Sequence, residues 1–246
     1  MIDITVKNID IPVVSDKVNL KGSIYFSSKT SFQAPWIVNL AGFMNHRESY
    51  LVKFFSEKFA NAGYYVLVYD YRGHGETQEE TGIEWFKMVP QIFSDIHVVL
   101  EWITLNQADR LLDEKIALFG RSLGGAIILS HGFIDEKAKI LIALSTRYDY
   151  QTIRGRYQAV EEQEGVKIIE KISPKSFLKK NQLNNNRILI AHCKDDKVVP
   201  FENLYQIKES LGLKDENVIE FDTGGHTFSK HREDIFNYSL EFLKKL

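Results

Sequence analysis

The chain has 246 residues, of which 44% are hydrophobic and 26% charged, and its formal net charge is −2 at pH 7. This composition is typical of a globular protein, and the length suits one α/β domain spanning residues 1–246. The balanced charge excludes a general electrostatic attraction to nucleic acid or to an anionic membrane surface, so we expect neither as a partner.

Two further features concern the compartment. No apolar run approaches the roughly 20 residues of a membrane-spanning helix, and the first residues lack the basic and apolar regions of a secretory signal. Cys193 is the only cysteine, which excludes an internal disulfide and is typical of the reducing cytoplasm. We therefore expect a cytoplasmic protein with no membrane span.

Short apolar runs recur along the chain and predict strands. Two early segments, residues 2–8 and 18–27, alternate in hydropathy and predict antiparallel edge strands. Later runs do not alternate cleanly, which is typical of strands covered on both faces of a parallel sheet. These later runs are residues 36–40, 65–69, 116–119, 140–144 and 188–191, with a last strand at 218–221.

Amphipathic patterns at helical spacing separate these strands. They lie at residues 47–62, 91–106, 123–134, 201–211 and 230–245. The alternation of strand and helix predicts an α/β fold with right-handed crossovers, in which helices cover both faces of a mostly parallel central sheet.

One connection is unusually long. About 40 residues separate the strand ending near Ser145 from the strand starting near Arg187, too many for a plain loop. We expect a small cap at about residues 147–186; the alternative is a surface excursion with no role in substrate binding. Its tyrosines favour an apolar acyl or aryl pocket, and its arginines favour attraction of a carboxylate. The side chains concerned are Tyr148, Tyr150, Tyr157, Phe177, Arg147, Arg154 and Arg156.

A candidate nucleophile lies in Gly120-Arg121-Ser122-Leu123-Gly124, which matches G-x-S-x-G between an apolar strand and an apolar helix. A sharp turn there strains the serine backbone, and the glycines avoid collisions with neighbouring backbone. The helix N-terminus beneath the serine favours developing negative charge. We expect Ser122 to be the nucleophile; the alternative is a Gly-rich connection with a helix-capping serine.

A serine hydroxyl needs a base and a group that orients the base. His226 follows the last strand, at the carboxyl edge of the sheet that also carries Ser122, which makes it the candidate base. Asp195 and Asp196 follow the strand at 188–191 on the same edge, and position alone does not choose between them. The other histidines fit less well, because they lie in helices, at a strand end or in other loops: His46, His74, His97, His131, His192 and His231.

Four motifs in order carry a resemblance to a known family. They are Asp70-Tyr71-Arg72-Gly73-His74-Gly75-Glu76-Thr77, the G-x-S-x-G motif, the stretch from His192 to Pro200, and Gly225-His226-Thr227-Phe228. Over nearly its whole length the chain resembles the α/β-hydrolase superfamily, and within it serine esterases related to feruloyl esterases and monoacylglycerol lipases. The resemblance implies Asp196 as the acid, in the superfamily's chain order of Ser, Asp and His. Thr77 departs from the pattern, which usually has serine there.

The resemblance also implies an oxyanion hole made of two backbone N–H groups. One belongs to Leu123, directly after the nucleophile, and the other to Phe43, which follows Gly42 after the third strand. Ala41 stands where the family usually has histidine, which bears on the orientation of the loop and not on a backbone donor. The alternative for Gly42-Phe43 is a plain turn.

Together these features predict a serine esterase that hydrolyses small-molecule acyl or aryl esters through an acyl-enzyme. Ser122 attacks, His226 takes its proton and Asp196 orients His226. No histidine–carboxylate spacing suits a metal, so we expect neither a metal nor a cofactor. The alternatives are amide or peptide hydrolysis of an aminopeptidase type, thioester hydrolysis or acyl transfer, and a non-catalytic binding protein. Dehalogenation and epoxide opening usually need an aspartate nucleophile, so Ser122 disfavours both.

Overall fold

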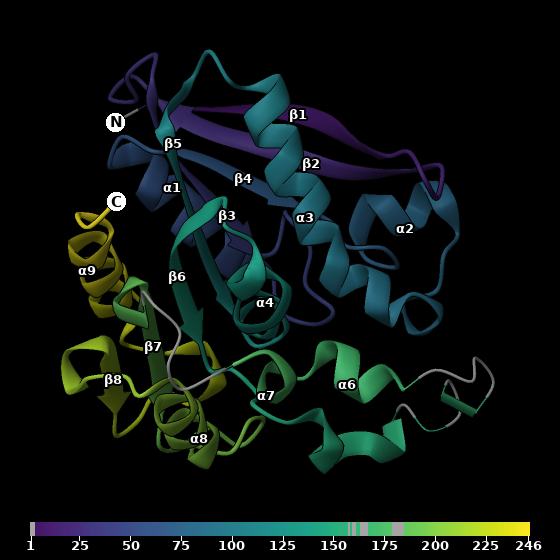
Figure 1. Cartoon of the computed structure of the whole chain (residues 1–246). Coiled ribbons are helices and arrows are strands. Elements are labelled where there is room, and N and C mark those ends of the chain that lie inside the picture. The colour runs from purple at the N-terminus through teal and green to yellow at the C-terminus, as the bar shows by residue number, and fades with distance from the viewer. Residues whose placement is uncertain (1–2, 157, 159–160, 163–166, 179–184) are drawn as a thin grey trace.

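A computed structural model describes residues 3–156, 158, 161–162, 167–178 and 185–246 (Figure 1). Within these residues an eight-stranded sheet has the order β1-β2-β4-β3-β5-β6-β7-β8. β1 and β2 are antiparallel to each other, as are β2 and β4, and all later neighbours are parallel. The predicted mostly parallel sheet is thus confirmed. The strands are β1 (Ile4–Val13), β2 (Val18–Ser27), β3 (Ala34–Leu40), β4 (Tyr65–Tyr69), β5 (Leu111–Arg121), β6 (Ala138–Leu144), β7 (Ile188–Cys193) and β8 (Val218–Phe221).

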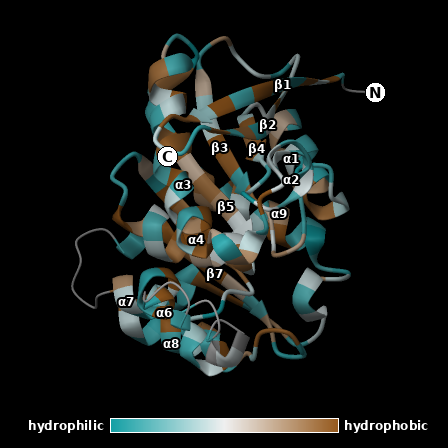
Figure 2. Ribbon diagram, turned by 90° about the vertical axis from the view of Figure 1, so that its right-hand side faces the viewer, coloured by the Kyte–Doolittle hydropathy of each residue, from teal (hydrophilic) through white to brown (hydrophobic). Residues whose placement is uncertain are grey.

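Helices cover both faces of this sheet, as predicted. Figure 2 shows α1 (Tyr50–Asn61) and α9 (Arg232–Leu243) on one face, with α3 (Val89–Asn106) and α4 (Leu123–Ile127) on the other. The other described helices are α2 (Gly75–Thr81), α6 (Ile168–Ile172), α7 (Pro174–Phe177) and α8 (Glu202–Leu211). Short 3₁₀ turns are η1 (Trp85–Lys87), η3 (Tyr150–Arg156), η4 (Asn185–Arg187), η5 (Asp215–Asn217) and η6 (Gly225–Thr227), and η2 (Ile128–Gly132) is a π-helical turn.

The central strands are apolar because both of their faces are covered. Every residue of β4 and every residue of β7 is buried. Figure 2 shows the middle strands largely in the colour of hydrophobic residues. This double burial explains why their sequences do not alternate, whereas β1 is buried at alternate positions in its second half, at Ile11 and Val13.

Three predicted elements differ in detail. Residues 18–27 form β2, which is paired on both sides, so the expectation that it is an edge strand was wrong, and β1 is the edge at this end of the sheet. β5 begins at Leu111, earlier than predicted, because Leu111 already pairs with Ala34; an irregularity with left-handed angles at Asp113 and Glu114 separates this pair from the regular pairing that starts at Ile116. The helix predicted at 123–134 changes to a π-helical turn, where the Ser130 hydroxyl donates to the Ala126 carbonyl at 2.6 Å.

The loop after β4 is tied down by the buried carboxylate of Asp70. It accepts hydrogen bonds from the backbone N–H groups of Arg47 at 2.6 Å and Glu76 at 3.0 Å. The Thr77 hydroxyl donates to the Asp70 carbonyl at 2.9 Å and accepts from the Lys21 N–H at 2.9 Å. The hydroxyl at position 77 makes both of these hydrogen bonds, and a threonine can make them as well as a serine.

The long connection between β6 and β7 contains η3, α6 and α7, and lies on the same side of the molecule as α2 in Figure 1. Its first part is anchored to α8, because the Tyr148 N–H donates to Asn203 Oδ1 at 2.9 Å and the Tyr148 hydroxyl lies 2.6 Å from Ser210 Oγ. Ile168, Ile169 and Ile172 bury the inner face of α6. The cap expected at about 147–186 remains a proposal.

The described aromatic side chains of this connection pack against core helices. The ring of Tyr150 lies 6.0 Å from that of Phe93 in α3, and the ring of Phe177 lies 5.1 Å from that of His131. Tyr157 and the side chains of Arg154 and Arg156 lie outside the described residues. Packing therefore accounts for Tyr148, Tyr150 and Phe177 without a role in substrate binding.

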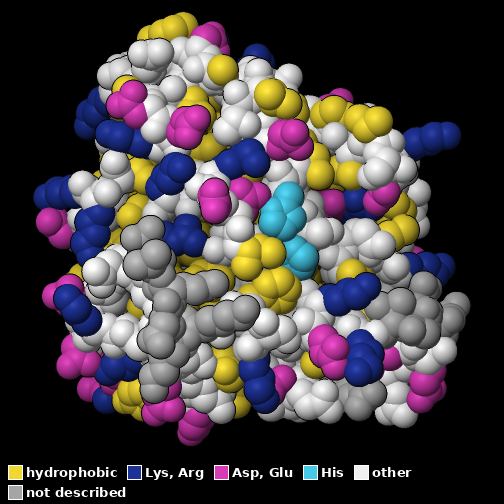
Figure 3. Space-filling model, viewed as in Figure 1, with side chains coloured by type: hydrophobic (Ala, Val, Ile, Leu, Met, Phe, Trp, Pro, Cys, Tyr) yellow, Lys and Arg dark blue, Asp and Glu magenta, His cyan; other side chains and the backbone are white. Residues whose placement is uncertain are grey.

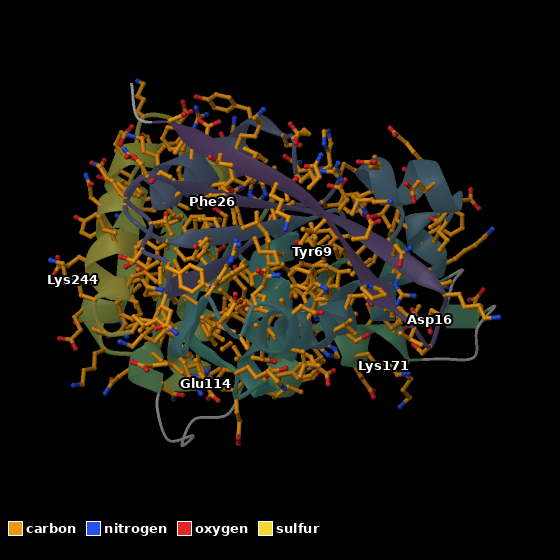
Figure 4. The ribbon with its side chains drawn as sticks, turned by 90° about the horizontal axis from the view of Figure 1, so that it is seen from above. Asp16, Phe26, Tyr69, Glu114, Lys171 and Lys244 are labelled. Atoms are coloured by element: carbon orange, nitrogen blue, oxygen red, sulfur yellow. The ribbon has the colours of Figure 1, made fainter. Side chains whose placement is uncertain are left out.

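A buried ion-pair network ties the β1–β2 hairpin to α3. Arg72 is almost fully buried, and its guanidinium donates to both carboxylate oxygens of Asp95, at 2.8 Å from Nε and 2.7 Å from Nη2. It also pairs with Asp16 at the tip of the hairpin (Figure 4). Burial raises the pKa of Asp95 although the Arg72 ion pair opposes this. Asp95 therefore depends on Arg72 to stay ionised inside the protein.

Arg72→Met should lower the free energy of unfolding by about 3–5 kcal/mol, because it leaves a buried carboxylate without its partner. The loss should be smaller at pH 5 than at pH 7.5. A carboxyl group whose folded pKa is raised binds protons more tightly in the folded state, so stability falls as pH rises above its unfolded pKa. Denaturant unfolding measures both values.

Lys53→Met is the control, because Lys53 forms an exposed ion pair with Glu48 and should cost less than about 1 kcal/mol. Equal losses for the two variants, or a loss for Arg72→Met that grows at pH 5, would contradict this account.

Candidate active site

Ser122 occupies the turn between β5 and α4 with backbone angles of φ 59° and ψ −113°. Such angles are costly for a residue with a side chain and mark a sharp strand-to-helix turn. The Ser122 N–H donates to the Leu144 carbonyl at 2.8 Å, and its carbonyl accepts from the Ala126 N–H at 2.9 Å. These bonds on both sides hold the strained turn that the G-x-S-x-G pattern predicted.

The glycines of this turn allow α4 to pack directly on neighbouring backbone. A Cβ at Gly124 would lie 2.3 Å from the Leu40 carbonyl oxygen, and one at Gly120 would lie 2.9 Å from it. A Cβ at Gly125 would lie 2.0 Å from the Thr146 hydroxyl. Backbone contact therefore joins the nucleophile turn to the end of β3, where the predicted oxyanion loop begins.

Asp196 and His226 meet at the ends of β7 and β8. His226 Nδ1 lies 2.7 Å from Asp196 Oδ2. An ionised carboxylate only accepts hydrogen bonds, so Nδ1 must carry the hydrogen, and the Nε2 atom of the neutral ring keeps its lone pair. This is the tautomer that a general base requires.

The carboxylate of Asp196 is fully buried and is saturated with donors. Oδ1 accepts from the N–H groups of Val198 at 2.8 Å and Val199 at 3.0 Å. Burial raises the pKa of Asp196, but hydrogen bonds from His192, His226 and the Val199 N–H outweigh it and hold the pKa well below its usual range. Asp196 is therefore ionised at neutral pH.

Sequence reasoning missed the contribution of His192. Its Nε2 lies 3.1 Å from Asp196 Oδ2 and 3.0 Å from the Val199 carbonyl oxygen, and the side chain is almost fully buried. Both neighbours accept, so Nε2 carries a hydrogen. The signal was present, since His192 begins the stretch that matches the family, but its position at a strand end gave no indication of a direct bond to the acid.

The neighbouring carboxylate, Asp195, holds the loop of the candidate base. It accepts hydrogen bonds from the N–H groups of Gly225 at 2.7 Å and Gly224 at 3.2 Å. The structure thus separates the two adjacent aspartates that position alone could not separate: Asp196 contacts the His226 ring, and Asp195 contacts the backbone that precedes it.

The third contact between loops comes from Arg121, the residue before Ser122. Its Nη1 donates to the His226 carbonyl oxygen at 3.2 Å. This bond brings the backbone of the His226 loop to the nucleophile turn. The bond joins Arg121 and His226, which lie 105 positions apart in the sequence.

The loop after β3 is held without the histidine usual in the family. The Tyr71 hydroxyl donates to the Ala41 carbonyl at 2.8 Å, and the Asn45 N–H donates to the Gly42 carbonyl at 3.0 Å. Within the described residues, the N–H groups of Phe43 and Leu123 donate to no other protein group. Two free amides next to a nucleophile turn are suited to binding an oxyanion.

Phe43 also brings an aromatic surface to this edge. The residue is 42% exposed, and its ring packs edge-on against Trp85 at 4.8 Å and His74 at 5.7 Å. Burial lowers the pKa of His74, so this ring stays neutral. The predicted oxyanion donor therefore belongs to a residue whose side chain forms part of an apolar surface.

Two further histidines lie elsewhere. His97 Nε2 lies 3.2 Å from His131 Nδ1, and His97 Nδ1 lies 2.7 Å from Asp135 Oδ2. Figure 3 shows histidine side chains beside an apolar patch on the face that α3 crosses. These contacts account for both histidines without a catalytic role.

In the described part of the chain, no group of three His, Cys, Asp or Glu side chains is arranged to hold a metal ion. Nor does any described helix have the length and apolar character of a membrane span. Burial raises the pKa of the Cys193 thiol to about 12, so it is not a nucleophile at neutral pH.

Residues 34–187 match a family model, Hydrolase_4, described as serine aminopeptidase, S33. Two curated Escherichia coli proteins, each an uncharacterized 31.7 kDa protein in the traX-finO intergenic region, are 31% identical over 110 residues. The matched part is 44% of this chain and 36% of those proteins, so it spans about a third of the length of these relatives.

Solved structures match over nearly the whole chain. Est1E from Butyrivibrio proteoclasticus with bound ferulic acid has a TM-score of 0.74 at 18% identity, covering 96% of this chain and 98% of that one. DcsB in complex with its substrate analogue has a TM-score of 0.73 at 16% identity, covering 98% of this chain and 99% of that one. Pyrococcus horikoshii acylaminoacyl peptidase has a TM-score of 0.70 at 18% identity, covering 97% of this chain and 41% of that one. With the sheet order, these likenesses confirm the predicted α/β-hydrolase fold.

Gly124→Ala should lower the free energy of unfolding by about 1–3 kcal/mol, because its Cβ would collide with the Leu40 carbonyl and push α4 away from β3. Gly155→Ala is the matched control, since a Cβ there meets nothing within 4 Å. Thermal unfolding of both variants measures the difference. A Gly124→Ala protein with the melting temperature of the Gly155→Ala control would show that the close contact is absent.

Proposed function

Since the chain belongs to the serine aminopeptidase S33 family of α/β hydrolases, we propose that it hydrolyses carboxylic esters, with Ser122, His226 and Asp196 as the catalytic triad. The observation that carries this proposal is the hydrogen bond of 2.7 Å between His226 Nδ1 and the buried, ionised Asp196. It fixes the ring in the tautomer that can take a proton, on a loop bonded to the residue before the strained serine.

The mechanism follows from these contacts. His226 Nε2 takes the hydroxyl proton as Ser122 Oγ attacks the acyl carbonyl, and Asp196 stabilises the imidazolium without taking the proton. The N–H groups of Phe43 and Leu123 bind the oxyanion of the tetrahedral intermediate. The imidazolium then protonates the leaving alcohol. A water molecule activated by His226 attacks the acyl-enzyme, which releases the carboxylic acid and restores Ser122.

Esters of apolar acyl or aryl groups are the substrates that the site supports best. The ring of Phe43 and its neighbour Trp85 place aromatic surface directly beside one of the two amides that would bind the oxyanion. An apolar group attached to the scissile carbonyl could pack there and gain from burial. The end-to-end likeness to Est1E, which is seen with ferulic acid, supports the same class.

Peptide or amide hydrolysis is the second candidate, because the matched family model is described as a serine aminopeptidase. The similar acylaminoacyl peptidase chains are much longer, and this chain covers 41% of them. A panel of p-nitrophenyl esters of increasing acyl length, an aryl ester, and aminoacyl and prolyl arylamides separates the two activities. Faster turnover of an arylamide than of every ester would favour the peptidase alternative.

Ser122→Ala should lower kcat for a p-nitrophenyl ester by about 10⁴–10⁶-fold, since it removes the attacking oxygen. A fluorophosphonate should label the wild-type protein at Ser122 alone, as mapped by peptide mass spectrometry. Ser130→Ala is the control, because Ser130 Oγ donates to the Ala126 carbonyl within the helix, and it should stay labelled. Wild-type turnover by Ser122→Ala, or labelling at another residue, would overturn the assignment.

The two adjacent aspartates provide a second test. Asp196→Asn should lower kcat by about 10⁴-fold, because an amide at this position favours the wrong tautomer of His226. Asp195→Asn should lower kcat by about tenfold or less, because it weakens two backbone bonds to the loop and leaves the ring contact in place. Steady-state kinetics at pH 8 compares the variants. A larger loss for Asp195→Asn than for Asp196→Asn would reverse the assignment of the acid.

A further inference from the structure

Arg121 combines three features that the proposed mechanism does not use. It directly precedes Ser122, its guanidinium donates to the His226 carbonyl oxygen at 3.2 Å, and a Cβ built on Gly42 would lie 2.9 Å from its Nη2. One side chain therefore contacts the loop of the base and the loop of the oxyanion hole, starting from the turn of the nucleophile. A side chain at residue 42 would have to displace this guanidinium.

The charge of this guanidinium is poorly compensated. Among the described residues no carboxylate forms an ion pair with it, and its hydrogen bond to the His226 loop goes to a neutral carbonyl. Behind the oxyanion loop it lines a small cavity whose other walls are mostly apolar, including Leu40, Phe55, Phe119 and Phe228. Burial lowers the pKa of Arg121 although the charge of Asp196 opposes this. An arginine in such surroundings still carries its positive charge at neutral pH.

We propose that Arg121 is a positioning residue. It fixes the His226 loop against the oxyanion loop, and it holds a positive charge next to both loops. This inference rests on the proposed function, because it gives the base and the oxyanion the roles described above. The charge acts in two ways. It favours the negative oxyanion in the transition state, and it disfavours the imidazolium form of the resting base, opposing the carboxylate of Asp196 on the other side.

The effect on the resting base changes the pH profile of the reaction, whereas the effect on the oxyanion changes kcat, so the two can be measured separately. Without the cation, protonation of the resting base becomes easier, so the acid limb of kcat/KM should move to higher pH. A purely structural role would lower kcat or the melting temperature and would leave this midpoint in place. Arg121→Lys keeps a cation, whereas Arg121→Gln and Arg121→Met are neutral, and Gln keeps a hydrogen-bond donor.

The experiment measures kcat/KM for a p-nitrophenyl ester from pH 5 to pH 9 in these three variants and in the wild type. Arg121→Gln and Arg121→Met should move the acid midpoint up by about half a pH unit and lower kcat by about tenfold, with a smaller change in KM. Arg121→Lys should keep the wild-type midpoint. Lys194→Gln removes an exposed cation that pairs with Asp222, and it should change neither quantity because water and salt screen it.

An unmoved midpoint in a folded neutral variant would overturn the proposal, and so would an equal shift in Arg121→Lys. Thermal unfolding establishes which variants are folded, and either neutral variant is sufficient. If both neutral variants fail to fold while Arg121→Lys folds, Arg121 is a structural residue and the proposal is wrong. A wild-type protein that no fluorophosphonate labels would contradict the proposed function itself, whereas a labelled protein with coinciding pH profiles contradicts only the role of Arg121.

Discussion

Parallel strands that end at one edge of the sheet are the constraint on which the candidate site depends. β3, β5, β7 and β8 run in the same direction, so the loops that carry Phe43, Ser122, Asp196 and His226 leave the sheet together. No single loop could assemble these groups, because they come from four separate stretches of the chain. Loops that are far apart in the sequence therefore leave the same edge of the sheet.

Polar contacts between the loops then fix their positions relative to one another. Asp196 joins the β7 and β8 loops through His226, Asp195 adds two bonds to the backbone of the same loop, and Arg121 joins that loop to the nucleophile turn. At the β3 end, Gly124 allows backbone contact with Leu40. Rigid positions matter for catalysis, because hydrogen-bond donors aimed at a developing charge act most strongly when they need not reorganise.

Much of this arrangement was predictable from sequence, and the reasons differ from residue to residue. Double burial of the central strands leaves an unmistakable apolar pattern, and a strained serine between strand and helix leaves a glycine pattern around Ser122. The choice of Asp196 over Asp195 needed the family pattern, since both occupy the same loop. The bond from His192 and the bridge from Arg121 left no pattern, because each depends on side-chain directions that only the folded loops define.

The details that differ from the prediction depend on contacts that form only in the folded chain. β2 is an inner strand because β4, which lies far away in the sequence, pairs with its other side. Alternation in hydropathy cannot indicate such a pairing. The π-helical turn after α4 contains Ser130, whose hydroxyl donates to the Ala126 carbonyl, and the apolar pattern of the helix does not indicate this bond. The role of the connection between β6 and β7 likewise depends on packing, and the contacts of Tyr148 and Tyr150 tie it to α8 and α3.

The most direct test of the account is the geometry of a phosphonylated protein, determined by crystallography. We predict a covalent bond from Ser122 Oγ to phosphorus, with His226 Nε2 within about 3.2 Å of Oγ or of the leaving-group position. One phosphonyl oxygen should lie within about 3.1 Å of the N–H groups of both Phe43 and Leu123. An adduct at Ser122 whose phosphonyl oxygen faces away from both amides, or a His226 ring out of reach of Oγ, would contradict the central claim.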